Sequence, residues 1–388
     1  MSLLGFLNAV CLTLGVGDGM DCHCRLEDLA TRGEPRFLAE LAARSTCEGG
    51  RLTLDAALGR PDSLVRGFLS RGKKEDVAAS ALRFAADSVR RFAEYWVTRS
   101  SHENLVLGGD LFELPSMVRA VRTGNFARVL VSVVPGDVGL PVGCAFSGCL
   151  PGVLDTPVPA PAEALSTPFL GLSFDDREIR ETLDRQGVDY GTHERIDTDV
   201  ARVLAEGRTV ARFAGKTEIG NRGLGNRVLL RSPRGELRRG RLGFRVGPNS
   251  YHALLPIDAF ADWFSSQGVD AARFRNAPGL VPPLPRFVAE CPGLLSWGGD
   301  VRVQTVCPTL TPRLHEILRE FESWTGIPIL AVAPFRLPDE PLVSSPLDAL
   351  RTFRALGADF AAIGSFLVGN PDHTPTTGAR PAPDSVRT

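Results

Sequence analysis

The spacing of apolar and polar residues over the first hundred positions is mainly that of helices. Between residues 75 and 97, apolar side chains recur every three or four positions, which predicts one long amphipathic helix. Residues 2–16 are mostly apolar with helical spacing, and a second helical pattern runs over residues 26–43. The start of the chain is therefore expected to be mainly helical.

A strand–helix–strand pattern follows this helical part. Residues 104–109 form a short apolar run that ends in a glycine pair, which predicts a buried strand. A helix over residues 114–123 and a strand over residues 128–134 complete the pattern. These three elements predict a βαβ unit.

A proline-rich segment over residues 151–168 separates the two parts of the chain, and its composition predicts an extended connector. Beyond it, helical and strand patterns alternate, which is typical of an α/β fold. Residues 371–388 are rich in proline, threonine, aspartate and arginine and predict a disordered tail. The expected helices cover 175–186, 198–206, 312–325 and 347–356, and the expected strands cover 210–214, 328–333 and 359–363.

The composition limits the class of protein. At 388 residues the chain exceeds what one core normally fills, so two domains are expected. Its 44 cationic and 45 acidic residues give a net charge of −1, so no overall field favours nucleic acid or an anionic membrane. No apolar run approaches the roughly 20 residues that span a bilayer. Eight cysteines without a leader pattern at the start indicate reduced thiols and a cytoplasmic location.

The triplet Cys22-His23-Cys24 consists of side chains that bind metals. Its spacing is too tight for a zinc knuckle, and no second Cys or His pair follows at a useful distance. The sequence therefore argues against a metal site at these residues.

Residues 215–227 carry the strongest chemical signal in the chain. They read Gly-Lys-Thr-Glu-Ile-Gly-Asn-Arg-Gly-Leu-Gly-Asn-Arg, with four glycines and the cations Lys216, Arg222 and Arg227. Glycines allow the backbone to approach a ligand, and these cations suit phosphate or carboxylate, so the segment predicts an anion-binding loop. A solvated hairpin turn is the alternative. The spacing fits neither a Walker loop nor a Rossmann fingerprint.

Several short motifs occur in an order that resembles the antibiotic and nodulation O-carbamoyltransferases. In that family the loop reads approximately G-R-x-E-F-G-P-R-A-L-G-N-R. Other matching motifs are Asn104-Leu-Val-Leu-Gly-Gly109, Gly136-Asp-Val-Gly139, Phe169-Leu-Gly, Val303-Gln-Thr-Val306, Thr325-Gly-Ile-Pro-Ile329, Glu340-Pro-Leu-Val343 and Ser345-Pro-Leu-Asp-Ala349. Together they extend over nearly the whole chain up to about residue 370.

The resemblance implies an α/β protein of two parts. Residues 1–150 would be the second half of an actin-like (ASKHA) domain, residues 151–168 a linker, and residues 169–370 a YrdC-like α/β domain, before the tail over 371–388. The second domain would convert carbamoyl phosphate and ATP to carbamoyl adenylate. The first domain, with a divalent metal, would pass the carbamoyl group to an alcohol on a small molecule.

The sequence departs from the family at the metal site. The family has two histidines one helical turn apart, and no two of the six histidines here have that spacing. Asp137 matches a further family ligand, which leaves it as the single candidate metal ligand. In the Gly108-Gly109 motif, Glu113 replaces an amide.

The second domain also departs from the family pattern. Where the family has the cluster expected to hold carbamoyl phosphate, a lysine becomes Val246 and arginines become Pro248 and His252. Where a Thr-Ser-Phe-Asn run is expected to contact nucleotide and acyl group, the chain has apolar residues and Arg336. Each hydrogen bond lost to a charged ligand costs about 1.5–3 kcal/mol, so three or four losses reduce the rate about 10⁴-fold or more. Carbamoyl adenylation by this chain alone is therefore not expected.

The candidate site residues follow from the loop and the resemblance. Lys216 and Arg222 are the candidate catalytic residues, because their charge would neutralise phosphate. For Asn226 and Arg227, tying the loop to neighbouring carbonyls is an equal alternative to ligand contact, and for Asp137 the alternative is a turn residue. The full set for substrate or anion binding is Lys216, Glu218, Arg222, Asn226, Arg227, His252 and Arg336, with Asp137 for the metal.

Three hypotheses for function remain. The first is a degenerate carbamoyltransferase homologue of specialised-metabolite biosynthesis that is non-catalytic or depends on a partner, such as a full-length homologue or a second copy. The second is an active carbamoyl or other acyl transferase with altered chemistry on a small-molecule acceptor. The third is an unrelated binding site formed by Asp110, Glu113, His252 and Arg336. None of them involves nucleic acid or a membrane.

Overall fold

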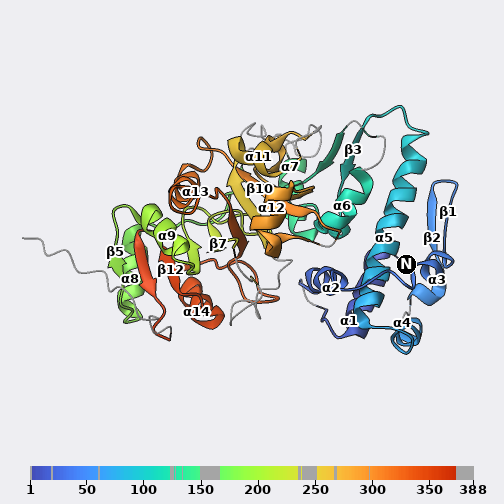
Figure 1. Ribbon diagram of the computed structural model, residues 1–388, viewed down its shortest axis with the longest axis horizontal. Coiled ribbons are helices and arrows are strands. Elements are labelled where there is room, and N and C mark those ends of the chain that lie inside the picture. Colours follow the sequence, from blue (N-terminus) through green and yellow to red (C-terminus); the bar gives the residue numbers. More distant parts are fainter. Residues whose placement is uncertain are drawn as a thin grey trace, which may run out of the picture.

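The protein folds into two lobes that lie end to end, as Figure 1 shows for the computed structural model. The N-terminal lobe contains the elements up to residue 148, and the C-terminal lobe contains those from residue 167 onward. The structure describes residues 2–18, 21–59, 62–122, 126, 128–132, 134–148, 167–234, 237, 251–265, 269–296 and 298–372. Most of the predicted connector over 151–168 and most of the predicted tail over 371–388 lie outside the described residues.

Helices form most of the N-terminal lobe. The long helix α5 packs its buried face, which includes Val77, Ala81 and Ala85, against α1, α2 and α3. The ring of Phe6 on α1 meets the ring of Phe84 on α5 edge to face at 5.5 Å. The elements are α1 (Leu3–Leu14), α2 (Cys22–Ala30), α3 (Leu38–Ala42), β1 (Ser45–Glu48), β2 (Arg51–Leu54), η1 (Ala56–Gly59), α4 (Asp62–Leu69), α5 (Lys74–Val97), β3 (Asn104–Leu107), η2 (Asp110–Glu113), α6 (Pro115–Arg122), β4 (Arg128–Val131), η3 (Asp137–Gly139) and α7 (Leu140–Ser147).

The single helix expected over residues 26–43 is wrong. The structure has two helices there, α2 and the short α3, with a turn over residues 31–37 between them. Pro35 lies in this turn, and proline disfavours helical backbone at the residue before it. Gly33 approaches α5 so closely that a β-carbon on it would lie 2.1 Å from the carbonyl oxygen of Glu75. The turn is therefore fixed by proline and by packing against α5.

The long helix and the βαβ unit are confirmed. Strands β3 and β4 pair in parallel with Leu105 opposite Val129, and α6 connects them. The hairpin of β1 and β2, which pair antiparallel, is not predicted by the sequence pattern. Gly49 and Gly50 form its turn with φ of 56° and 73°, a conformation that glycine adopts without strain.

A mixed sheet of nine described strands forms the centre of the C-terminal lobe. The pairs β6–β12 and β8–β10 are parallel, and the other pairs are antiparallel. In spatial order the strands are β5 (Gly191–Thr192), β13 (Phe366–Gly369), β12 (Phe360–Ile363), β6 (Val210–Phe213), β7 (Arg227–Arg231), β11 (Leu330–Pro334), β8 (His252–Pro256), β10 (Val301–Val306) and β9 (Gly279–Val281). The lobe is therefore of the mixed α/β class, as the sequence predicts.

Helices cover both faces of this sheet and bury separate hydrophobic clusters. Helices α9 (Ile196–Ala205) and α13 (Pro312–Thr325) pack Val200, Leu204 and Ile317 against one face. Leu183 and Phe353 belong to the cluster on the other face. The elements there are α8 (Asp176–Arg185), α11 (Phe260–Trp263), α12 (Pro285–Glu290) and α14 (Pro346–Leu356), with the short turns η5 (Ile257–Ala259), η6 (Ala271–Phe274) and η7 (Pro292–Leu294).

The predicted helices and strands of this lobe are confirmed within a few residues. Helix α8 is capped by Asp175, whose carboxylate accepts from the amide of Glu178 at 2.8 Å. In the described part of the chain, no helix is both long and apolar enough to cross a membrane.

Candidate functional site

The glycine- and arginine-rich loop connects β6 to β7. These strands pair antiparallel, with Phe213 directly opposite Arg227, so residues 214–226 are the connection of a hairpin. Gly215, Gly220 and Gly225 have φ of 55°, 91° and 143°. The alternative of a hairpin is therefore correct in topology, but much of the loop is buried rather than solvated.

Three of the predicted ligand residues hold the loop in shape. The carboxylate of Glu218, which is 4% exposed, accepts from the amides of Leu224, Asn226 and Arg227 at 2.8, 2.7 and 3.1 Å. The guanidinium of Arg227 is fully buried over the ring of Phe213, 3.7 Å from its centroid. It donates to the carbonyl oxygens of residues 172, 214, 215 and 226.

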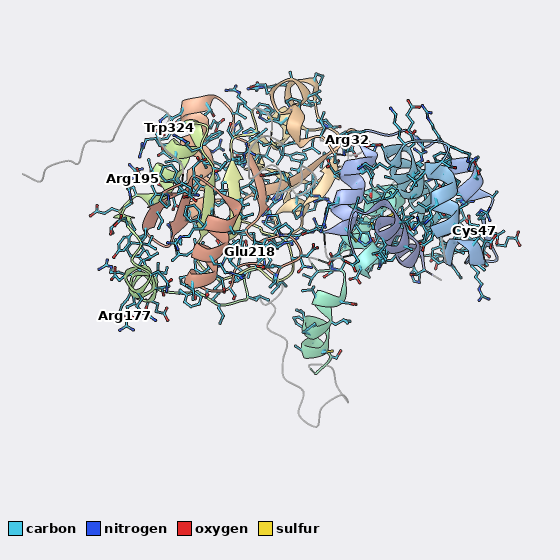
Figure 2. All side chains as sticks on the ribbon, turned by 90° about the horizontal axis from the view of Figure 1, so that it is seen from below. Arg32, Cys47, Arg177, Arg195, Glu218 and Trp324 are labelled. Carbon is cyan, nitrogen blue, oxygen red and sulfur yellow. The ribbon has the colours of Figure 1, made fainter. Side chains whose placement is uncertain are left out.

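The Asn226 side chain donates to the carbonyl oxygen of Lys216 at 2.8 Å. Asn226 and Arg227 therefore make the loop contacts that the sequence offered as their alternative role. The Lys216 side chain is exposed and does not line the cavities described below. Figure 2 shows Glu218 on the C-terminal lobe.

Three other predicted residues meet in a small cavity between the lobes, here called the arginine cavity. Arg222, His252 and Arg336 line it from the loop, from β8 and from the segment after β11. Its volume is about 60 Å³. The remaining lining residues are Asp21, Cys24, Glu113, Asn221, Gly223, Arg302 and Pro334.

The N-terminal lobe supplies a polar partner to each arginine of this cavity. The guanidinium of Arg336 contacts both carboxylate oxygens of Asp21, one of them at 2.8 Å. Arg302 lies 3.6 Å from a carboxylate oxygen of Glu27, and both side chains are buried. The guanidinium of Arg222 donates to the backbone carbonyl oxygen of Glu113. The lobes are thus joined through the arginine side chains.

Burial and neighbouring charge shift the pKa values in this cavity. Burial raises the pKa of Asp21, but the hydrogen bonds and charge of Arg336, with the amide of Asp339 and the charge of Arg25, together outweigh burial and hold the pKa below its usual value. Burial raises the pKa of Glu113, against the charge of Arg222. Burial, and then the charge of Arg302, lowers the pKa of Arg222.

His252 is neutral in this site. Burial lowers its pKa to about 3, and its Nε2 lies 2.8 Å from Oε1 of Gln304. The amide nitrogen of Gln304 donates to the carbonyl oxygen of Leu224 at 2.7 Å, so Oε1 is the acceptor for a hydrogen on Nε2. His252 therefore adds no positive charge to the cavity.

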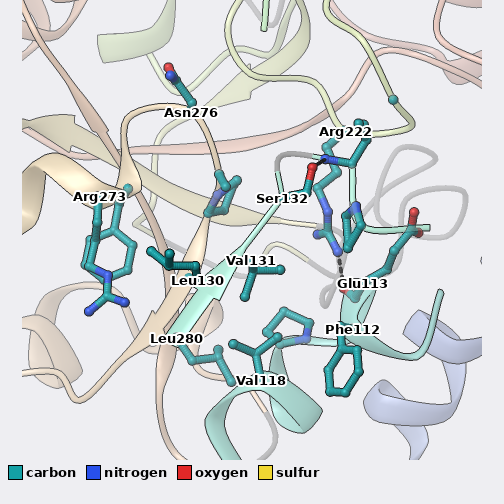
Figure 3. A pocket seen from close by; sticks show the side chains of 18 of the residues that line it. Phe112, Glu113, Val118, Leu130, Val131, Ser132, Arg222, Arg273, Asn276 and Leu280 are labelled. Carbon is teal, nitrogen blue, oxygen red and sulfur yellow. Dashed lines mark hydrogen bonds between the residues drawn. The ribbon is translucent and has the colours of Figure 1, made fainter. Parts of the chain in front are cut away.

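A larger cavity of about 140 Å³, the junction cavity, adjoins the arginine cavity (Figure 3). The two cavities share Glu113, Asn221 and Arg222 as lining residues. In Figure 3, Arg222 and Glu113 lie together at one end, and Arg273 lies on the other side of Leu130 and Val131. The rest of the lining comes largely from α6, β4 and residues 273–280.

Arg122 on α6 lines the junction cavity beside Arg273. Burial, and then the charge of Arg273, lowers the pKa of Arg122 to about 10. Its Nε is buried, with no hydrogen-bond partner within the part of the chain that the structure describes. The junction cavity therefore combines an apolar wall with a buried cation.

Comparison with known proteins relates part of this chain to one family. Residues 201–370 match the family described as Carbamoyltransferase C-terminus. The chain is 28% identical to the nodulation protein NolO of Bradyrhizobium diazoefficiens over 261 residues, which cover 63% of this chain and 45% of NolO. It is 28% identical to the 3'-hydroxymethylcephem-O-carbamoyltransferase of Amycolatopsis lactamdurans over 174 residues, 43% of this chain and 31% of that protein.

These matches support a divergent member of the carbamoyltransferase family. The chain is also 26% identical to an uncharacterized protein of Synechocystis over 324 residues, 76% of this chain and 52% of that protein. The chain spans about half the length of the curated relatives it matches, or less.

The match to the carbamoyltransferase family includes only one side of the arginine cavity. Arg222, His252, Arg302 and Arg336 lie in the matched segment, whereas Asp21 and the other N-terminal residues lie outside it.

Arg302 is a site residue that is not among the residues predicted from the sequence. Arg302 and Gln304 alternate on β10 among apolar residues, so they share one face of a buried strand, and this pattern could have indicated them. Asp21 and Cys24 carry no comparable signal, because only the packing of α2 brings them to the cavity.

Asp137 lies at the start of η3, in a cluster with other acidic groups. Its amide donates to the Asp110 carboxylate at 2.9 Å. A β-carbon on Gly136 would lie 1.9 Å from a carboxylate oxygen of Asp110 and 3.0 Å from one of Glu113, so both acids approach this turn. Asp137 itself is not part of the close group of metal-type ligands found among the described residues. Its role as a metal ligand remains a prediction.

Proposed function

We propose that this protein is a degenerate carbamoyltransferase-family subunit of specialised-metabolite biosynthesis. In this proposal it binds a phosphate-type anion at the arginine cavity but does not make carbamoyl adenylate alone, and a longer family member completes the reaction. The observation that carries the proposal is the set of N-terminal side chains on the cavity arginines, with Asp21 on Arg336 and Glu27 on Arg302. These carboxylates neutralise the guanidinium groups that an anionic substrate would need in order to bind.

An anionic substrate would have to displace these carboxylates from the arginines. Carbamoyl phosphate would have to compete with Asp21 for Arg336, and breaking a buried ion pair by removing one partner costs about 3–5 kcal/mol. Such a cost corresponds to a loss of roughly 200-fold or more in affinity. His252, which stands at a family arginine in the sequence comparison, is neutral and does not compensate. Binding is therefore expected to be weak while α2 remains docked on the cavity.

The two expected substrates, carbamoyl phosphate and ATP, differ in how well they fit the arginine cavity. A cavity of about 60 Å³ can hold an ion-sized group, and Arg222, Arg302 and Arg336 would hold its oxygens once the carboxylates withdraw. A nucleotide needs a pocket of about 300 Å³ or more, so ATP does not fit the arginine cavity. No step through ATP is assigned to these residues.

The domain assignment belongs to the same proposal. Residues 1–150 would be part of an actin-like domain, residues 151–168 a linker, and residues 169–370 a YrdC-like domain. The βαβ unit of β3, α6 and β4 and the nine-stranded sheet support this division. Asp137 would be the remaining ligand of a divalent metal, whose other ligands a partner would supply. The acceptor would be an alcohol on a small molecule.

An active acyl transferase with altered chemistry is the second candidate. The contact between the junction cavity and the arginine cavity favours it, because an acceptor in the first would lie beside an anion in the second. Glu113 lines both cavities and has a raised pKa, which suits a group that accepts a proton from an acceptor hydroxyl. Carbamoyl phosphate would then be the donor.

The experiment measures pyrophosphate release from ATP and carbamoyl phosphate by the full chain, alone and mixed with a longer family member. The degenerate-subunit proposal expects no release above background by the chain alone and a gain over the partner alone in the mixture. Turnover by the chain alone would overturn it and favour the second candidate.

A ligand assay separates the residues. Arg222→Ala should abolish the increase in Tm that inorganic phosphate produces, whereas Lys216→Ala, at an exposed cation outside the cavities, should preserve it. Equal loss in both variants would contradict the placement of the anion in the arginine cavity.

A further inference from the structure

Two helices of the N-terminal lobe bring three strong metal ligands together outside the arginine cavity. Cys11 lies on the buried face of α1, and Cys22 is the first residue of α2, followed by His23. The two sulfur atoms and one ring nitrogen of His23 lie within 4.8 Å of one another. The ten residues between the cysteines hide this cluster from the sequence, which argued against a metal at the Cys22-His23-Cys24 triplet.

The backbone explains why the cluster forms. Helix α1 ends at Gly15, which takes a left-handed conformation with φ of 70°, and the amide of Val16 returns to the carbonyl oxygen of Cys11 at 3.0 Å. This cap turns the chain so that α2 packs back on α1. The start of α2 is thereby placed beside the last turns of α1.

The three side chains make few other contacts. The Cys11 thiol donates to the carbonyl oxygen of Cys22 at 3.6 Å, a long and weak hydrogen bond. Nε2 of His23 is buried and has no hydrogen-bond partner among the described residues. A buried polar atom without a partner is unfavourable and calls for a ligand or an ion. Cys11 and Cys22 are 0% and 2% exposed, so the sulfur side of the cluster is shielded from water.

We propose that Cys11, Cys22 and His23 bind one thiophilic metal ion, Zn²⁺ in particular. Zinc binds thiolate sulfur at about 2.3 Å and imidazole nitrogen at about 2.0 Å, so tetrahedral ligands lie about 3.5–3.8 Å apart. Ligand atoms within 4.8 Å reach that geometry after a shift of roughly 1 Å. Binding would release the thiol protons of the two cysteines. Three protein ligands leave the fourth position to water or a further group.

The proposed zinc site would act on the position of α2. Asp21 directly precedes Cys22, and Cys24 lines the arginine cavity. A metal that ties the start of α2 to α1 would therefore fix the segment that delivers Asp21 to Arg336. This inference does not depend on the proposed function, because metal binding is measured without turnover.

The test titrates the reduced, metal-free full chain with Zn²⁺ and with Co²⁺. One equivalent should bind, and Co²⁺ should give a thiolate-to-cobalt charge-transfer band. Loss of an outer-shell partner already weakens metal affinity about 10–100-fold, so Cys22→Ser and His23→Gln should weaken it more than about 100-fold. His23 is only partly buried, so His23→Gln tests the site without opening the core.

Two cysteines serve as matched controls. Cys24→Ser changes the neighbouring thiol, which lines the arginine cavity instead, and Cys47→Ser changes a thiol at the far end of the lobe (Figure 2). Both variants should keep the affinity of the unaltered chain. The proposal would be overturned by the absence of a stoichiometric band, by a band that survives Cys22→Ser and His23→Gln, or by equal loss in Cys24→Ser. A Cys11–Cys22 disulfide in the protein as isolated without reductant would also overturn it.

Discussion

Replacing Asp21 by asparagine should strengthen phosphate binding while it weakens the contact between the lobes. Asp21 neutralises Arg336 inside the arginine cavity, and the two side chains are 15% and 10% exposed. Two unit charges about 6 Å apart interact by about 2.8 kcal/mol at an effective dielectric constant of 20. Removing the repulsion between Asp21 and a bound anion should therefore increase phosphate affinity up to about 100-fold.

The same substitution removes one partner of a buried ion pair. The loss in the free energy of unfolding approaches about 3–5 kcal/mol if no hydrogen bond to Arg336 is kept. The asparagine side chain should keep part of this hydrogen bonding and so reduce the loss. The assay is calorimetric titration with phosphate, together with the Tm of each variant. Asp300→Asn is the matched control, because Asp300 is a buried carboxylate that joins the lobes through Arg119 at 2.9 Å, away from the arginine cavity. It should lower the Tm without raising the affinity.

Unchanged or weaker phosphate binding in Asp21→Asn would refute the argument that carboxylates of the N-terminal lobe compete with an anion. Arg336→Gln completes the comparison, because it removes the cation instead of its competitor. The double variant Asp21→Asn with Arg336→Gln should lose the increase in phosphate affinity that Asp21→Asn alone shows. A gain that persists in the double variant would place the anion elsewhere.

Three further predictions concern the loop and its neighbours. Glu218→Ala leaves three backbone amides, two buried and one partly buried, without an acceptor at about 1–3 kcal/mol each. It should therefore lower stability by about 3 kcal/mol or more and speed hydrogen exchange at these amides, whereas Glu218→Gln should lose about 1 kcal/mol. In the folded protein His252 has a pKa of about 3, whereas an unfolded histidine protonates near pH 6.5. The free energy of unfolding, measured by chemical denaturation, should therefore fall by up to about 1.4 kcal/mol per pH unit below pH 6.5. The fall should be less steep in His252→Gln. Gly223→Ala should lower the Tm, because its β-carbon would lie 2.4 Å from the carbonyl oxygen of Arg227, while Gly67→Ala, which meets nothing within 4 Å, should not.

Hydrophobic periodicity predicted most of the fold, because the buried faces of long helices and central strands depend on local spacing. The helix over 75–97 and the strand over 210–214 are examples that the structure confirms. The failures depend on tertiary contacts. The turn after α2 requires Gly33 to approach α5, and the two short strands of the first hairpin lack the length that periodicity needs.

The sequence predicted which segment carries the candidate site, but not which of its residues line a cavity and which hold the loop. Charge and glycine content indicated the loop, yet they could not separate Arg222, which lines both cavities, from Arg227, which is fully buried. That difference follows from the hairpin register, which places Arg227 opposite Phe213. The carboxylates on Arg336 and Arg302 come from α2 and the residue before it, 315 and about 275 residues earlier in the chain, and pairing at such a distance leaves no trace in a local pattern.

Contact between the lobes and anion binding use the same guanidinium groups, so each should weaken the other. If Asp21 and Glu27 reduce the affinity of the cavity for phosphate, phosphate must reduce the affinity of the N-terminal lobe for the cavity by the same factor, because coupling between two binding equilibria is reciprocal. A partner that drew α2 away from Arg336 would then increase anion affinity without adding a ligand of its own. This coupling gives a physical reason for partner dependence: the cations remain in place, and the step left to a partner is the removal of the carboxylates that neutralise them.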